Sequence, residues 1–79
     1  MPLTLLGIGE KATIAQITGD SELRMFLTER GFSHGKNIEV VQFTFGDNII
    51  VKMGNTRLAL DRRMAHHIHI DMLKEQSHV

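Results

Sequence analysis

Alternating apolar and polar residues recur in short runs along this chain of 79 residues, and they predict strands. The runs cover residues 12–17, 38–43, 49–53 and 57–60, with the two-residue period of a half-buried strand. In the second run, Ile38, Val40 and Gln42 are expected to share one face. The pair Gly54-Asn55 joins the last two runs and suits a tight hairpin turn, because it tolerates positive φ.

Helical spacing appears over residues 21–30 and predicts the one substantial helix. Its apolar members form a stripe of about two turns that faces the core: Leu23, Phe26 and Leu27. Asp20 or Ser21 can accept hydrogen bonds from the first turn. Gly31 stands where a helix ends in a left-handed residue, and Phe32 is expected to pack back against the helix.

The C-terminal part combines a short helical turn with a strand. Asp61 can cap a turn over 62–65, and the last strand is expected over 66–70, with Ile68 and Ile70 inward. Residues 72–79 are polar and are expected to be frayed.

The expected fold is therefore mainly β: an antiparallel barrel of about five strands, closed on itself and plugged by the helix between the first two strands. A chain of this length forms one domain, over 1–71.

Composition limits the function. Nine Lys and Arg residues balance nine Asp and Glu residues, whereas a nucleic-acid-binding protein usually has a basic excess. There is no cysteine, so no disulfide or thiolate metal site is expected. No apolar run approaches the ~18–20 residues that cross a bilayer, and the first residues lack the basic region of a signal peptide. A soluble protein of the cytoplasm, without membrane insertion, is expected.

An ordered set of positions resembles the FeoA family of ferrous iron transport proteins. The set extends over residues 3–71 and consists of Leu5, Gly9, the run 12–17, the helix with Gly31 and Phe32, Gly35, Ile38, Val40, the run Arg57-Leu58-Ala59-Leu60, Ala65, Ile68 and Ile70. The resemblance implies an SH3-like barrel and an accessory protein of bacterial ferrous iron uptake that is not an enzyme. It also implies a partner, the membrane transporter FeoB, which has a cytoplasmic GTP-binding domain. The protein is expected to modulate the assembly or the GTP cycle of this transporter.

Histidines near the C-terminus are candidate metal ligands. If Ile68 and Ile70 face the core, alternation places His67, His69 and Asp71 outward on one face. Neutral imidazoles suit iron and zinc, but a structural zinc site needs four ligands. A solvated strand face is therefore the first interpretation, and no cofactor is expected to be required. Sensing or carrying a metal through these histidines stays open as an alternative function.

Two surfaces are candidates for docking a partner. One is the exposed side of the helix, with Arg24, Thr28 and Glu29, and the other is a basic region. The members of the basic region are Arg57, Arg62 and Arg63.

No catalytic arrangement of residues appears, because Gly7-Ile8-Gly9 lacks the Lys-Ser/Thr of a phosphate loop and no serine has a histidine at a motif spacing. A nucleic-acid-binding barrel is a further alternative. It predicts exposed aromatic residues, but the four phenylalanines are expected mostly in the core.

Overall fold

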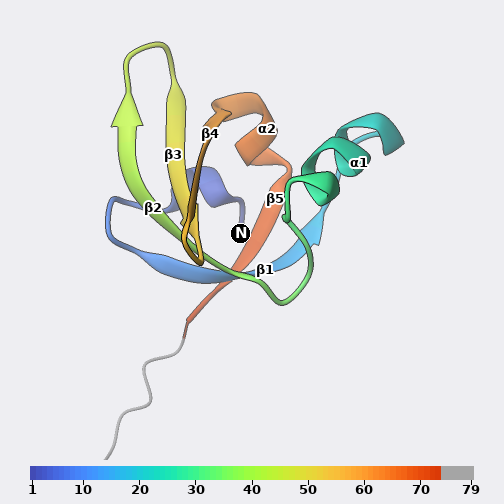
Figure 1. Cartoon of the computed structure of the whole chain (residues 1–79), viewed down its shortest axis with the longest axis horizontal. Coiled ribbons are helices and arrows are strands. Elements are labelled where there is room, and N and C mark those ends of the chain that lie inside the picture. The colour runs from blue at the N-terminus through green and yellow to red at the C-terminus, as the bar shows by residue number, and fades with distance from the viewer. Residues whose placement is uncertain (74–79) are drawn as a thin grey trace, which may run out of the picture.

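A computed structural model describes residues 1–73 (Figure 1). Along the chain, its elements are the 3-10 helix η1 (Leu3–Leu5), strand β1 (Lys11–Ile17), helix α1 (Ser21–Glu29), strands β2 (Asn37–Thr44), β3 (Asn48–Met53) and β4 (Thr56–Asp61), helix α2 (Arg62–His66) and strand β5 (Ile68–Met72). Met72, the first residue of the end that was expected to be frayed, is the last residue of β5. Residues 74–79 of that expected end lie outside the described part.

The strands form one antiparallel sheet in the order β4-β3-β2-β1-β5. The mainly β fold with a helix between β1 and β2 is confirmed. The sheet curls (Figure 1) but does not close, because β4 and β5 are not hydrogen-bonded to each other within the described residues. The N-terminus covers part of the outer edge of β5, where Pro2 bridges to His69 and Ile70 N donates to the carbonyl of Met1.

Helix α1 begins and ends as its sequence predicts. The Asp20 carboxylate accepts from Leu23 N at 2.8 Å, and Gly31 adopts a φ of 95°. The amides of Gly31 and Phe32 donate to the carbonyls of Thr28 and Leu27, both at 3.0 Å. These two bonds form a Schellman motif, which satisfies the last carbonyls and turns Phe32 back toward the core.

The core is apolar throughout the described residues. Its largest fully buried side chains are Phe32, Leu3, Ile14, Leu27, Ile38, Ile49, Ile68, Ile70, Val40 and Val51. Helix α1 contributes one buried residue, Leu27, whereas Leu3 of η1 and Ala65 of α2 are also buried and these two short helices contact each other. The expected plug by the main helix is therefore wrong in part, because η1 and α2 share that role.

A β-bulge in β2 changes which residues face the core. Val40 pairs with Val51, but Gln42 pairs with Ile50 and Phe43 with Ile49, so Val41 is an extra residue. Paired residues lie on one face of a sheet. Phe43 thus shares the face of buried Ile49, and the expectation that Gln42 shares the face of Val40 was wrong.

The hairpin turn and the segment after β4 follow their local signals closely. Gly54 has a φ of 58°, and positive φ at the first turn residue alone fits a type II′ hairpin. Asp61 caps α2 by accepting from Met64 N at 2.7 Å. Helix α2 extends to His66, however, so β5 spans Ile68–Met72 instead of 66–70.

Candidate functional site

The outer side of α1 forms a mixed charged and apolar surface. Arg24, Thr28 and Glu29 are exposed there, as expected, and the side chain of Met25 is 63% exposed among them. Arg30 stacks its guanidinium 3.5 Å from the centre of the Phe26 ring and donates to the Phe26 carbonyl. A cation held on an aromatic face in this way gives the surface a fixed positive group.

A groove of about 470 Å³ lies between α1 and α2. Leu23, Phe26 and Met64 supply its apolar lining, and each is only partly buried against the core. The polar residues that line it are Asp20, Glu22, Asp61, Arg63 and His67. The sequence suggested the helix stripe but gave no sign of the groove, because the groove depends on how α2 lies beside α1.

The three arginines of the expected basic region do not form one patch. Arg57 pairs with Lys52 near the turn of the β3–β4 hairpin, whereas Asp61, at the other end of β4, pairs with Asn48. Four residue steps along the strand place Arg57 about 13 Å from Asp61. Arg63 lines the groove beside α1.

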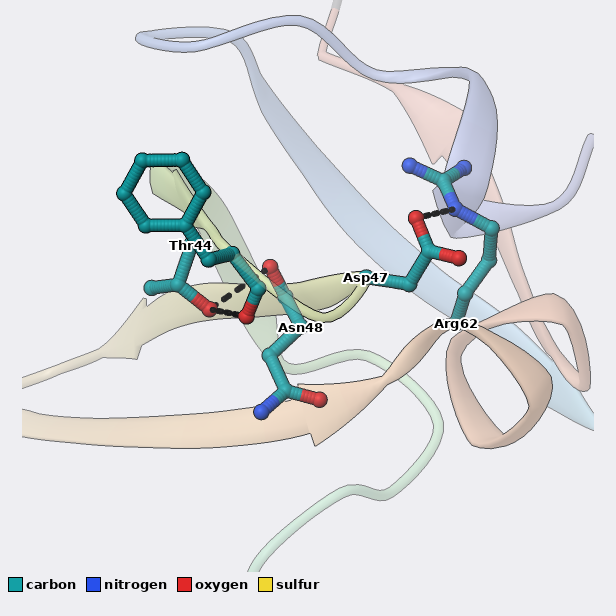
Figure 2. A network of polar contacts seen from close by, with 5 residues as sticks. Thr44, Asp47, Asn48 and Arg62 are labelled. Atoms are coloured by element: carbon teal, nitrogen blue, oxygen red, sulfur yellow. Dashed lines mark hydrogen bonds and ion pairs between the residues drawn. The ribbon is translucent and has the colours of Figure 1, made fainter.

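Arg62 ties the start of α2 to the tip of the β2–β3 hairpin (Figure 2). Its Nε lies 3.8 Å from Oδ1 of Asp47, and its amide donates to the Asp47 carbonyl at 3.1 Å. Thr44 Oγ1 lies 3.5 Å from the Asn48 carbonyl across the same tip. These contacts hold the tip in place, although an ion pair this exposed adds little stability.

The same hairpin carries an aromatic residue that sequence reasoning placed wrongly. Phe45 is fully exposed and Phe43 is 39% exposed, so only Phe32 among the phenylalanines is buried. The expectation that most phenylalanines lie in the core was wrong, because Phe45 lies in the hairpin turn and Phe43 stays partly exposed although it shares the face of Ile49.

Two of the three candidate metal ligands, His67 and His69, contact the same side chain, that of Thr18. Nδ1 of His67 and Nε2 of His69 lie 3.1 and 3.2 Å from Oγ1 of Thr18. His67 follows α2 in a helical conformation, so strand alternation does not apply to it. Asp71 pairs with Thr13 further along β5. Within residues 1–73, no group of three or more His, Cys, Asp or Glu side chains could hold an ion, so His67, His69 and Asp71 do not come together as one set of ligands.

These observations define a class of protein. Five antiparallel strands curled around a small apolar core are typical of an SH3-like domain. The FeoA domain model matches residues 1–72, and the chain therefore belongs to the FeoA family of non-enzymatic accessory proteins of ferrous iron transport.

Solved structures of FeoA proteins agree with this membership. The chain is 35% identical to iron(II) transport protein A from Clostridium thermocellum, with a TM-score of 0.85 over 92% of this chain and 46% of that chain. FeoA from Chlorobium tepidum is 26% identical, with a TM-score of 0.86 over 98% and 74% of the two chains.

A third relative is the zinc complex of FeoA from Stenotrophomonas maltophilia, a prokaryotic SH3 domain protein. It is 25% identical, with a TM-score of 0.79 over 90% and 89% of the two chains. No curated protein sequence matches the chain. In the part of the chain that the structure describes, no helix has the length and apolar character to cross a membrane.

Proposed function

We propose that this chain assists ferrous iron uptake by docking, from the cytoplasm, on the GTP-binding domain of the membrane transporter FeoB. Membership of the FeoA family over residues 1–72 is the observation that carries the proposal. One domain over 1–71 performs the docking and modulates the assembly or the GTP cycle of the transporter. Docking needs no cofactor and no contact with nucleic acid, which the balanced charges disfavour.

The outer side of α1 and the adjacent groove are the proposed docking surface. Partly exposed apolar side chains line the groove, and charged side chains surround them. Protein interfaces have this arrangement of an apolar centre and a polar rim. Both ends of α1 are capped, and the helix presents Arg24, Thr28 and Glu29. The backbone positions of these residues are therefore fixed before binding, which lowers the entropy cost of association.

The second proposed surface is the start of α2 with the hairpin tip beside it. Arg62 and Arg63 belong to this surface, whereas Arg57 lies toward the opposite end of β4. Arg62 already has a partner in Asp47, and a docking protein must compete with that contact. This competition makes the α1 surface the stronger candidate.

A binding titration against detergent-solubilised, full-length FeoB tests the proposal. Arg24→Glu is expected to weaken binding while leaving the melting temperature unchanged, since exposed charge changes usually cost under ~0.5 kcal/mol of stability. Arg62→Glu is compared beside it. Lys36→Glu is the matched control, because Lys36 is exposed in the turn before β2 and the charge change is identical.

The outcomes separate the two surfaces. Loss of affinity in Arg24→Glu alone supports the α1 surface. Loss in Arg62→Glu alone moves the site to the start of α2. If the wild-type chain does not bind the transporter, the proposed function is wrong.

A further inference from the structure

Three polar side chains meet where β1 ends, and they come from separate parts of the fold. Thr18 follows β1, His67 follows α2, and His69 lies in β5. The two ring nitrogens point to one atom, the hydroxyl oxygen of Thr18, at 3.1 and 3.2 Å. All three residues are half-buried, so their polar atoms are partly shielded from water yet reachable.

These separations match those between ligands of a small metal ion. A tetrahedral ion with bonds of about 2.0–2.1 Å holds neighbouring ligand atoms about 3.3–3.4 Å apart. The two oxygen–nitrogen distances are already within about 0.3 Å of that value. To share one ion, the two ring nitrogens must also reach this separation from each other, which requires rotation of the imidazole side chains.

The backbone around the three residues is fixed. Thr18 N donates to the His67 carbonyl at 2.9 Å, and His67 N donates to the Met64 carbonyl at 3.0 Å. His69 is held on both sides, by pairing with Gln16 and by the bridge to Pro2. Ligands held in this way lose little conformational freedom when an ion binds, which favours binding.

The approach to the cluster also favours a cation. His67 lines the groove between α1 and α2, and three carboxylates line the same groove against one arginine, Arg63. The carboxylates belong to Asp20, Glu22 and Asp61. A groove with more negative than positive charges raises the local concentration of cations.

We propose that Thr18, His67 and His69 form an exchangeable site for one divalent first-row transition metal ion. The ligand atoms are Nδ1 of His67, Nε2 of His69 and Oγ1 of Thr18, and the remaining position takes water or a donor from outside the chain. Imidazole nitrogen selects ions of the zinc, nickel and iron type, with Fe²⁺ bound more weakly than Zn²⁺ or Ni²⁺. The proposed site does not rest on the proposed docking, although His67 also lines the groove that belongs to the proposed docking surface.

Without an ion, the same cluster is a hydrogen-bonded bridge: the single Thr18 hydroxyl proton goes to a ring nitrogen or to the His67 carbonyl, 3.4 Å away, and its oxygen accepts from a ring N–H. A titration of the full chain with Zn²⁺ alone, in a buffer that does not bind metal, separates the bridge from the metal site. We expect saturable binding of one ion, with ring ¹⁵N shifts at Nδ1 of His67 and at Nε2 of His69.

Variants test each ligand. His67→Asn and His69→Asn are each expected to lower affinity roughly tenfold or more, because few protein ligands remain. His66→Asn is the matched control, since its ring is a neighbour, 6.2 Å from that of His67. Asp71→Asn is the second control, and both controls are expected to retain wild-type affinity.

Several results would overturn the proposal. If binding does not saturate by about 1 mM Zn²⁺, the cluster is a hydrogen-bonded bridge and not a metal site. Unchanged affinity in Thr18→Val removes Thr18 from the ligand set. Loss of binding in His66→Asn or Asp71→Asn places the ion elsewhere. If a histidine variant fails to fold, the ring ¹⁵N shifts of the wild-type chain still decide which nitrogens bind the ion.

Discussion

Truncation of Leu27 to alanine tests how α1 is held against the sheet. Leu27 is the one residue of α1 without exposed surface, and it packs with Phe32 in the core. Its carbonyl also accepts the amide of Phe32 in the Schellman motif. The substitution leaves this backbone bond intact and removes only side-chain carbons, so its effect reports packing.

The expected cost follows from the burial. Leu→Ala removes three carbon atoms at about 0.8 kcal/mol each, and the cavity left behind brings the total to about 2–5 kcal/mol. A domain of 79 residues has about 4–12 kcal/mol of stability in all. At about 4–8 °C per kcal/mol, we expect the melting temperature to fall by roughly 10 °C or more. If the stability of the wild-type chain lies at the low end of this range, the variant is expected to be unfolded.

Thermal and urea unfolding followed by circular dichroism measures the loss. Met25→Ala is the matched control, because Met25 lies in the same helix but is 63% exposed. It is expected to change stability by less than ~0.5 kcal/mol. A melting temperature unchanged by Leu27→Ala would refute the assigned core face. Equal losses in the two variants would show that burial of the side chain does not set the cost, because both substitutions introduce the best helix former.

Three further perturbations address the turns, the caps and the metal. Gly54→Val should cost more than about 1 kcal/mol in urea unfolding, since an added Cβ meets no atom within 4 Å and the penalty comes from positive φ alone; an equal loss in Gly54→Asn would contradict this reasoning. Asp61→Ala should cost about 1 kcal/mol by removing the cap of α2, while Asp61→Asn should recover most of it. Chelator should leave the melting curve unchanged, because apolar side chains complete the core, and a large loss would show that an ion supports the fold.

The sequence by itself determined the elements whose signals are local. Asp20 and Gly31 set the ends of α1, because a cap and a left-handed residue act on the adjacent turn. Gly54 set the β3–β4 turn in the same way. The resemblance to the FeoA family also rested on such local positions. It predicted the SH3-like fold and the link to iron transport, whereas residue spacing alone did not predict the link to iron transport.

The tertiary structure decided every feature that depends on pairing between distant segments. The bulge at Val41 placed Phe43 on the core face, because the register of β3 outweighs strict alternation in β2. The extra helical residue His66 shifted β5 and brought His67 to Thr18, about fifty positions away in the sequence. Hydrophobic periodicity indicates which side of an element faces the core, but it contains no information about which other element lies there, so the groove and the histidine cluster appear only once the chain is folded.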